Sequence, residues 1–259
     1  MPNQIDMSPI PAEQNAAGLP LGFWATLGWT LLAVAAGLLA MLAVGATLAR
    51  WDPSLNVAQE MLRPGGRSAI VSSLLMLMQG VIVAILIFAA RRSRGSALMY
   101  LGLVRPRGRY VLLGFLCVVL PLLFIFAHAQ FDIRQIVPPE QFGRAREANI
   151  WHMQAYLLII SAVIAAPIME EIVFRGFLYR GLSATRLGVV GTILITSVVW
   201  ALIHIEKSPA AMFDTAVHGV IWGWLRWYTG STWVTIGAHT ANNAIAVLLS
   251  VAAMYGLFG

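Results

Sequence analysis

Two glutamates and an arginine directly follow an uncharged stretch of the chain. The stretch AYLLIISAVIAAPI leads into MEEIVFRG, which contains Glu170, Glu171 and Arg175. Glu171 and Arg175 are four residues apart, so on a helix they lie on one face and can form an ion pair. Glu170 is rotated by about 100° from Glu171 and cannot share that arginine equally. The spacing therefore predicts one paired, structural glutamate and one glutamate that serves as a general base.

Two histidines and an amide occur at helical spacing later in the chain. WALIH places His204 four residues after Trp200, and HTANN places Asn243 four residues after His239. Such a histidine and amide can both donate to one oxygen, although hydrogen bonding between helices is an alternative use for them. A carboxylate and two histidines on three helices favour a hydrolytic site, in which a base activates water and nearby donors stabilise an oxyanion.

Other polar and aromatic patterns favour structural roles. Asp214 and His218 are four residues apart and can pair with each other. Gly219 and Gly223 form a G-x-x-x-G pattern, which lets a neighbouring helix approach closely. A group of tryptophans predicts an aromatic belt at the membrane interface; they are Trp222, Trp224, Trp227 and Trp233.

The composition requires that these residues be held by membrane helices. Of 259 residues, 59% are hydrophobic and 11% are charged, whereas soluble domains carry about 25% charged residues. Such a chain cannot cover itself with a water-facing surface, so we expect a multi-pass protein of the cell membrane, with the lipid bilayer as a partner. The formal charge of +6 does not indicate nucleic acid as a partner, because many arginines lie in loops between apolar runs, where they set topology.

Apolar runs of roughly 20 residues predict an all-α fold, a polytopic transmembrane helical bundle of seven to eight spans. The eighth span is expected only if 130–152 or the chain ends contain another short helix. The segment Ser96–Val104 is short, and we expect an interfacial helix or an extension of a neighbouring span there. We expect a polar N-terminal tail at 1–20 and a single transmembrane domain at 21–259. The seven predicted spans are 22–49, 69–90, 110–129, 153–182, 188–205, 212–228 and 232–255.

Arginines between the second and third spans predict the orientation of the chain. Six of them lie between positions 91 and 109, and cytoplasmic loops carry an excess of such residues. This places the N-terminus in the cytoplasm and, with seven spans, the C-terminus outside. A site shared by Glu170 and His204 also requires that they lie at similar depth on antiparallel helices. That condition predicts that the fourth helix runs on through about Ser183.

These short patterns, taken together, resemble the motifs of one family. EEIVFR is similar to the E-E-x-x-x-R motif of the CPBP family of intramembrane endopeptidases, the CAAX protease and bacteriocin-processing (Abi) proteins. WALIH resembles its F-x-x-x-H motif, with Trp200 in place of the usual phenylalanine. HGVIWGWLRWYTGS resembles its glycine-spaced third motif, and HTANN its final H-x-x-x-N motif. All four occur in order within about 150–250, the predicted protease-like core, and residues 1–130 carry no such motif.

The resemblance implies an intramembrane endopeptidase that cleaves a peptide bond near the membrane surface. Glu170 would be the catalytic glutamate, and His204 would help it to hold and activate a water molecule. His239 and Asn243 would bind the oxyanion of the tetrahedral intermediate. The ion pair predicted above would be the structural support beside them. The implied partner is a peptide or protein substrate, for which a lipid-modified, prenylated C-terminal peptide is the best-known class in the family.

The sequence leaves the cofactor and the class of function open. Glu170, His204 and His239 could form a three-ligand zinc site with one open position, although the chain has no H-E-x-x-H motif. We favour a metal-free mechanism, in which these residues act without a resident metal. A non-catalytic immunity or scaffold protein would keep the same polar core for packing. A proton-coupled transporter would use Glu170 and the histidines as a proton relay.

Overall fold

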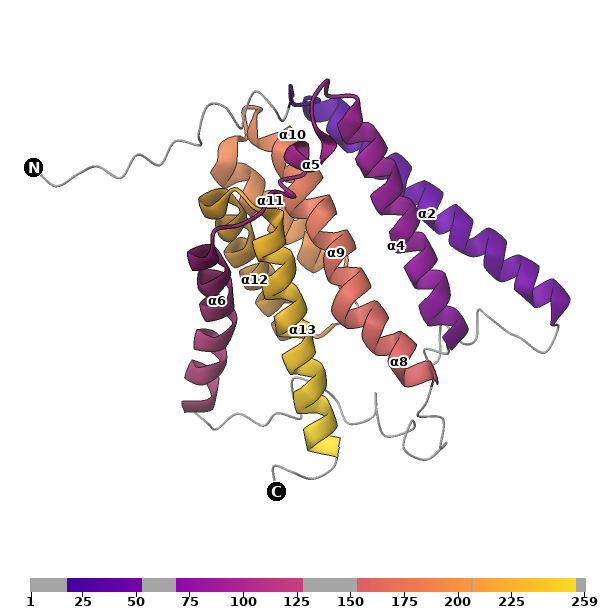
Figure 1. Ribbon diagram of the computed structural model, residues 1–259. Helices are drawn as coiled ribbons and strands as arrows, with labels where there is room; N and C mark the ends of the chain where they lie inside the picture. The colour runs from indigo at the N-terminus through magenta and orange to yellow at the C-terminus, as the bar shows by residue number, and fades with distance from the viewer. Residues whose placement is uncertain (1–17, 53–68, 128–152, 206, 255–259) are drawn as a thin grey trace, which may run out of the picture. The chain divides into compact units, whose positions relative to one another are not determined.

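The computed structural model describes residues 18–52, 69–127, 153–205 and 207–254. Within these ranges every regular element is helical, which confirms the predicted all-α fold. The segment 130–152 and the chain ends, where an eighth span was possible, lie outside the described residues. The α-helices, labelled in Figure 1, are α2 (Phe23–Trp51), α4 (Ala69–Arg91), α5 (Ala97–Tyr100), α6 (Gly108–Ala127), α8 (Met153–Ile159), α9 (Ala166–Glu171), α10 (Tyr179–Ser183), α11 (Gly188–Leu202), α12 (Pro209–Thr229) and α13 (Thr232–Met254).

Three helical stretches among the described residues are long and apolar enough to cross a membrane. They are α2, α4 and the continuous stretch Tyr156–Ser183. Two shorter apolar helices, Gly108–Leu120 and Gly188–Leu202, occupy two further predicted spans. α12 and α13 occupy the last two predicted spans, but polar side chains interrupt their apolar character. The long apolar helices support the prediction of a membrane protein, whereas the predicted count of seven to eight spans is not confirmed.

The helix that carries the two glutamates runs on through Ser183, as predicted. It is not a uniform α-helix, because two π-helical segments interrupt it. The first π-helical segment is Ile160–Ala165 and the second is Ile172–Leu178. A π-helical turn is closed by hydrogen bonds between residues five apart, and such turns occur frequently at functional sites. The sequence predicted a helix here without indicating these two widened turns.

The chain divides into two compact units. The boundary between them passes between the adjacent residues Glu170 and Glu171. Unit 1 consists of Met1–Thr30, Ala84–Gly114 and Glu171–Gly237, and unit 2 consists of Leu31–Val83, Phe115–Glu170 and Ala238–Gly259.

Close packing of α11 against α12 forms the centre of unit 1. A Cβ atom at Gly219 would lie 2.7 Å from the Cβ of Ser197, and one at Gly223 would lie 2.8 Å from the Cγ2 of Ile193. Only glycine lets the two backbones approach this closely, which confirms the role predicted for the G-x-x-x-G pattern. Gly230 then ends α12 with a φ angle of 70°, a left-handed conformation that glycine adopts without strain.

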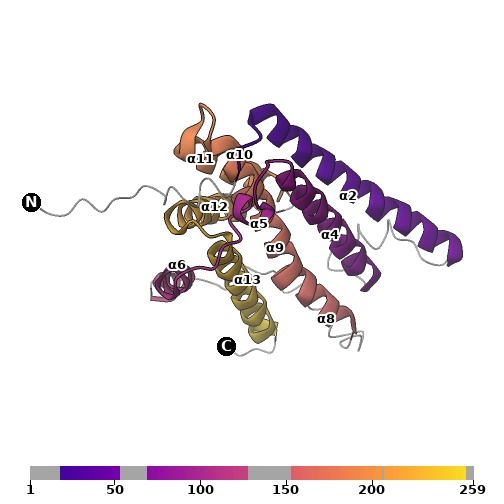
Figure 2. The same cartoon turned by 45° about the horizontal axis from the view of Figure 1, so that its top comes forward.

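α5 packs into unit 1 through its C-terminal end, while Leu98 is 57% exposed, so the expectation of an interfacial helix or an extension at Ser96–Val104 stays a prediction. Tyr100 and Leu101 are 0% exposed, and the ring centre of Tyr100 lies 5.8 Å from that of Phe177. Figure 1 and Figure 2 both show α5 beside the helix that includes α9 and α10. Leu101, which follows α5, accepts a hydrogen bond from the hydroxyl of Thr232 at the start of α13. Burial raises the pKa of the Tyr100 phenol, so this side chain stays neutral in the core.

The aromatic belt predicted on α12 and α13 needs one correction. Trp222 is 0% exposed, so it belongs to the core of unit 1 rather than to a membrane interface. It is buried because it shares the inward face of α12 with Gly219 and Gly223, which pack on α11. Exposed rings suitable for an interface remain at Trp224, Trp227 and Trp233.

In unit 2, α2 and α4 pack closely and α13 packs on the first π-helical segment. A Cβ atom at Gly37 of α2 would lie 2.9 Å from the Cγ1 of Ile82 and 3.0 Å from the carbonyl oxygen of Met78. Between α13 and the first π-helical segment, the Nδ2 of Asn243 donates a hydrogen bond to the carbonyl oxygen of Ala162 at 2.9 Å. This bond links the helix of the final motif to the helix of the glutamates.

Candidate active site

Glu171 and Arg175 form a buried ion pair, as their spacing predicts. The Nη1 of Arg175 lies 2.9 Å from the Oε1 of Glu171, and the two side chains are 2% and 0% exposed. The Nη2 of the same arginine donates to the carbonyl oxygen of Gly219 at 3.1 Å. A buried ion pair is tolerated only when its geometry is good and further hydrogen bonds satisfy its remaining donors, and the bond to Gly219 meets that need.

The ring of Trp200 contacts both Arg175 of this ion pair and His204. The guanidinium carbon of Arg175 lies 4.7 Å from the ring centre of Trp200, within range of a cation–π interaction. His204 follows the end of α11 and is half-buried, with its ring centre 5.7 Å from that of Trp200. Unit 1 therefore brings Glu171, Arg175 and His204 into one contact chain through a single tryptophan.

The ring of His204 has a defined tautomer when it is neutral. Its Nδ1 lies 2.8 Å from the carbonyl oxygen of Trp200. A carbonyl oxygen can only accept, so Nδ1 must carry the hydrogen, and the Nε2 of the neutral ring is left as an acceptor. An acceptor nitrogen of this kind can hold one hydrogen of a water molecule.

The remaining predicted site residues belong to unit 2. Glu170 lies in α9 and is half-buried, while its neighbour Glu171 is fully buried. His239 of α13 is 5% exposed. Asn243 follows it by one turn and donates to Ala162, which is the interhelical hydrogen bond that its sequence also allowed. That bond uses one hydrogen of the Asn243 amide, which has two.

Glu170, His204 and His239 do not form the donor set of a metal site. Among the described residues, no three histidine, cysteine, aspartate or glutamate side chains form a group that could hold a metal ion. No step of the reaction is therefore assigned to a metal at these three residues.

Arg226 is an additional buried arginine that sequence reasoning missed. It is 8% exposed, and its Nε donates to the carbonyl oxygen of Arg175 at 3.0 Å. One signal was available in GWLRWY, where a single arginine interrupts an apolar, aromatic run. A charge in such a setting needs a compensating partner. The identity of that partner, 51 residues away, depends on the tertiary fold.

Asp214 and His218 pair with each other, as predicted. The Nδ1 of His218 lies 3.3 Å from the Oδ2 of Asp214 on the same helix, and the Asp214 side chain is 66% exposed. Lys207 donates to the hydroxyl of Thr215 nearby, at 3.2 Å. This pair lies in the N-terminal half of α12, where His218 begins the third motif and Asp214 precedes it.

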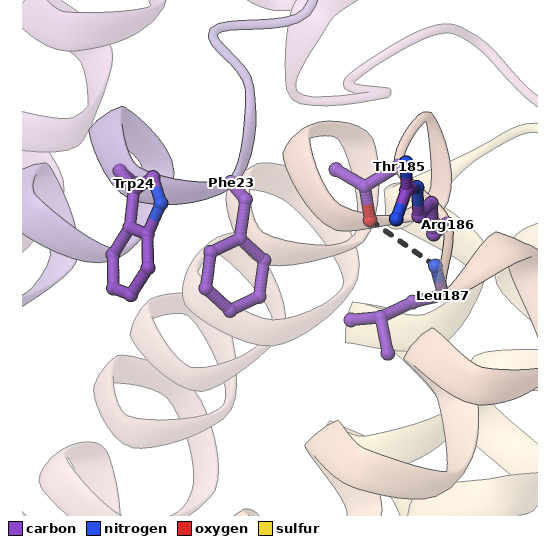
Figure 3. Close-up of a pocket in the computed structure, with 5 residues that line it drawn as sticks. All are labelled: Phe23, Trp24, Thr185, Arg186 and Leu187. Atoms are coloured by element: carbon purple, nitrogen blue, oxygen red, sulfur yellow. Dashed lines mark hydrogen bonds between the residues drawn. The ribbon is translucent and has the colours of Figure 1, made fainter.

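A cavity of about 340 Å³ lies elsewhere in unit 1, between the start of α2 and the turn that joins α10 to α11. Figure 3 shows its walls, in which Phe23 and Trp24 face the turn residues. The backbone N–H of Leu187 donates to the hydroxyl of Thr185 at 3.3 Å within that turn. No motif residue lines this cavity, so it is not the candidate active site.

Comparison with known proteins gives two matches and one negative result. Residues 152–245 match the family model described as "Type II CAAX prenyl endopeptidase Rce1-like". The chain is also 32% identical, over 119 residues, to the curated Bacillus subtilis (strain 168) protein described as "Putative membrane peptidase YdiL". That alignment covers 42% of this chain and 46% of the relative, so the chain matches about half of the relative's length. No solved structure matches the chain.

These matches confirm the resemblance to the CPBP family that the four motifs indicated. The matched range 152–245 contains the four motifs in full, including both histidines and Asn243. The individual roles of the motif residues stay predictions.

Proposed function

We propose that this chain, whose residues 152–245 resemble the type II CAAX prenyl endopeptidases, is a membrane peptidase that cleaves a peptide bond near the membrane surface. Its substrate is a peptide or protein at the bilayer. Because the matched family is described as a prenyl endopeptidase, a lipid-modified C-terminal peptide is the first class to test.

The different surroundings of two adjacent glutamates carry this proposal. The Glu171 side chain is fully buried and bound to Arg175, which is itself bound to the carbonyl oxygen of Gly219. Glu170, one residue earlier, is half-buried. One glutamate therefore supports the fold, and the other retains the exposure that a water-activating base needs.

In the proposed reaction, the Glu170 carboxylate takes a proton from a water molecule as the water oxygen attacks the peptide carbonyl carbon. His204 holds the same water through its Nε2, the acceptor left by the bond from Nδ1 to Trp200. His239 and Asn243 donate to the oxyanion, and loss of one such donor typically lowers the rate by about 10²–10³-fold. Glu170 then returns the proton to the leaving nitrogen as the C–N bond breaks.

The test is proteolysis by the purified, detergent-solubilised protein on a panel of membrane-tethered peptides, with and without a lipid modification. Glu170→Gln and His204→Ala are compared with the wild type, and Asp214→Asn serves as a control for a carboxylate outside the motifs. Each protein is assayed with and without a strong chelator. We expect cleavage by the wild type and by Asp214→Asn, and none by the two motif variants.

The assay with chelator distinguishes a metal-free mechanism from one in which these residues bind a metal. Cleavage that persists in chelator supports a glutamate-activated water, whereas cleavage that is lost in chelator and restored by zinc makes the same residues metal ligands. Full activity in Glu170→Gln would contradict the proposal.

A further inference from the structure

Arg226 has no role in the water activation or the oxyanion binding proposed above. Its guanidinium is buried in unit 1, where a charge is unfavourable unless it is hydrogen-bonded or paired. Its Nε donates to the main chain of Arg175, which lies inside the second π-helical segment. The energetic penalty of burying this cation is therefore offset at one specific point of the helix that carries the glutamates.

A preformed cradle holds the guanidinium in place. On one side, the ring centre of Tyr179 lies 5.0 Å from the guanidinium carbon of Arg226. On another side, Gly102 adopts a φ angle of 67°, and a Cβ atom at this position would overlap the guanidinium. Glycine is needed at position 102 both for the backbone angle and for the space.

The loop that forms this second wall is itself fixed to the junction of α12 and α13. The Oγ1 of Thr232 donates to the carbonyl oxygen of Leu101 at 2.6 Å, and its N–H donates to that of Gly102 at 2.7 Å. The hydroxyl of Ser231 donates to the carbonyl oxygen of Val104 at 2.7 Å. Three hydrogen bonds to backbone oxygens thus keep the wall beside Arg226.

Arg175 is consequently tied to α12 at two points. Its side chain donates to the carbonyl oxygen of Gly219, and its own carbonyl oxygen accepts from Arg226. Gly219 and Arg226 are seven residues, or two helical turns, apart on the buried face of α12. Two attachment points separated along α12 restrain both the sliding and the rotation of the second π-helical segment.

We propose that Arg226 is a positioning residue, which locks the second π-helical segment onto α12 and thereby holds the Glu171–Arg175 pair and the adjoining Glu170 in their working orientation. The catalytic consequence rests on the peptidase function proposed above. The lock itself is a property of unit 1 and does not depend on that function.

Arg226→Met is the informative variant, because it removes the donor and the charge while keeping a long side chain. Removal of a buried charge does not by itself destabilise a protein when apolar bulk replaces it. Arg226→Lys keeps a charge and a donor. Arg180→Met is the matched control, since it also removes an arginine of unit 1 whose charge lies near Arg226, but Arg180 donates to the carbonyl oxygen of Gly18 rather than to that of Arg175.

In the cleavage assay, we expect kcat of Arg226→Met to fall by about 100-fold with little change in KM, as for other small misplacements of catalytic groups. Arg226→Lys is expected to recover part of that loss, and Arg180→Met is expected to match the wild type. A merely structural role would lower the amount of folded enzyme without changing kcat per folded molecule.

Hydrogen exchange in detergent gives a readout that needs no substrate. We expect the amides of 172–179 to exchange about tenfold faster in Arg226→Met than in the wild type or Arg180→Met, because a local opening becomes more frequent. Gly102→Ala, which displaces the guanidinium without removing it, is expected to accelerate the same amides and covers the case in which Arg226→Met does not fold.

Unchanged exchange of these amides in Arg226→Met and Gly102→Ala overturns the proposal. Accelerated exchange with an unchanged kcat also overturns it, because the lock would then not position the catalytic group. If the wild type cleaves no peptide, accelerated exchange still supports the lock, and the failure belongs to the proposed peptidase function.

Discussion

The guanidinium of Arg175 lies 4.7 Å from the ring centre of Trp200, while its Nη1 is bound to Glu171. The aromatic residue of one motif therefore covers the ion pair of another. The F-x-x-x-H motif that WALIH resembles has phenylalanine at the position of Trp200, and tryptophan is the stronger cation–π partner.

Trp200→Phe is expected to fold and to remain active, because a phenyl ring still presents a π face to Arg175. Trp200→Leu is expected to lower the free energy of unfolding by about 2 kcal/mol or more, since a buried cation–π contact is lost together with ring volume. Chemical unfolding in detergent measures both. Equal stability of the phenylalanine and leucine variants would show that the ring face contributes nothing.

Glu171→Gln is expected to be a folding defect, whereas Glu170→Gln is expected to be a catalytic one. Loss of the Glu171 charge leaves Arg175 buried without its counter-ion, which typically destabilises by about 3–5 kcal/mol. Glu170 is half-buried, and we expect its amide variant to change stability by less than about 1 kcal/mol. Thermal unfolding and cleavage, measured on the same preparations, separate the two. The prediction fails if Glu170→Gln unfolds as readily as Glu171→Gln.

Gly219→Ala is expected to destabilise unit 1 by about 1–3 kcal/mol. The added methyl group would stand 2.7 Å from the Cβ of Ser197, so α11 and α12 would have to separate. Gly237→Ala is the control, because a Cβ atom there meets nothing within 4 Å, and alanine inside α13 is expected to stabilise by up to about 1 kcal/mol. Similar losses from both substitutions would indicate a general effect of glycine replacement.

Asn243 offers a test between oxyanion binding and packing. Its hydrogen bond to Ala162 predicts that Asn243→Ala loses about 1 kcal/mol of stability. If the amide also binds the oxyanion, kcat falls by about 10²–10³-fold, far more than that stability loss explains. Initial rates normalised to folded protein provide the comparison. A loss confined to stability would assign Asn243 to packing alone.

The orientation of the chain can be tested with single cysteines in a Cys117→Ala background, since Cys117 is the sole native cysteine. Arg186→Cys lies in the exposed turn after α10, and Asp52→Cys lies at the exposed end of α2. With the N-terminus in the cytoplasm, an impermeant thiol reagent added to intact cells labels the second and not the first. The opposite pattern would reverse the topology.

Local relationships in this protein could be predicted from the sequence. Helix positions followed from apolar runs, and the pairing of Glu171 with Arg175 followed from a spacing of four residues. The end of the glutamate helix at Ser183 followed from a requirement of depth. Each of these depends on residues close together in the chain or on the thickness of the membrane.

Relationships that depend on tertiary packing could not be predicted. Both π-helical segments contain a carbonyl oxygen that accepts from a side chain of a distant helix, Ala162 from Asn243 and Arg175 from Arg226. The donors lie 81 and 51 residues away, so no local pattern specifies the widened turns. The burial of Trp222 also depends on tertiary packing. The sequence pattern of an apolar helix is the same whether its tryptophan faces lipid or another helix.

The attachment of Leu101–Val104 to Ser231 and Thr232 has a consequence for how such proteins diverge. Every acceptor that this loop offers to those two residues is a backbone carbonyl oxygen, so its side chains can change without loss of the attachment. Gly102 is the exception, because Arg226 occupies the space of its Cβ. Distant homologues are therefore expected to share the backbone conformation of this loop but little of its amino-acid sequence. A conserved glycine at the position of Gly102 would identify the loop in an alignment.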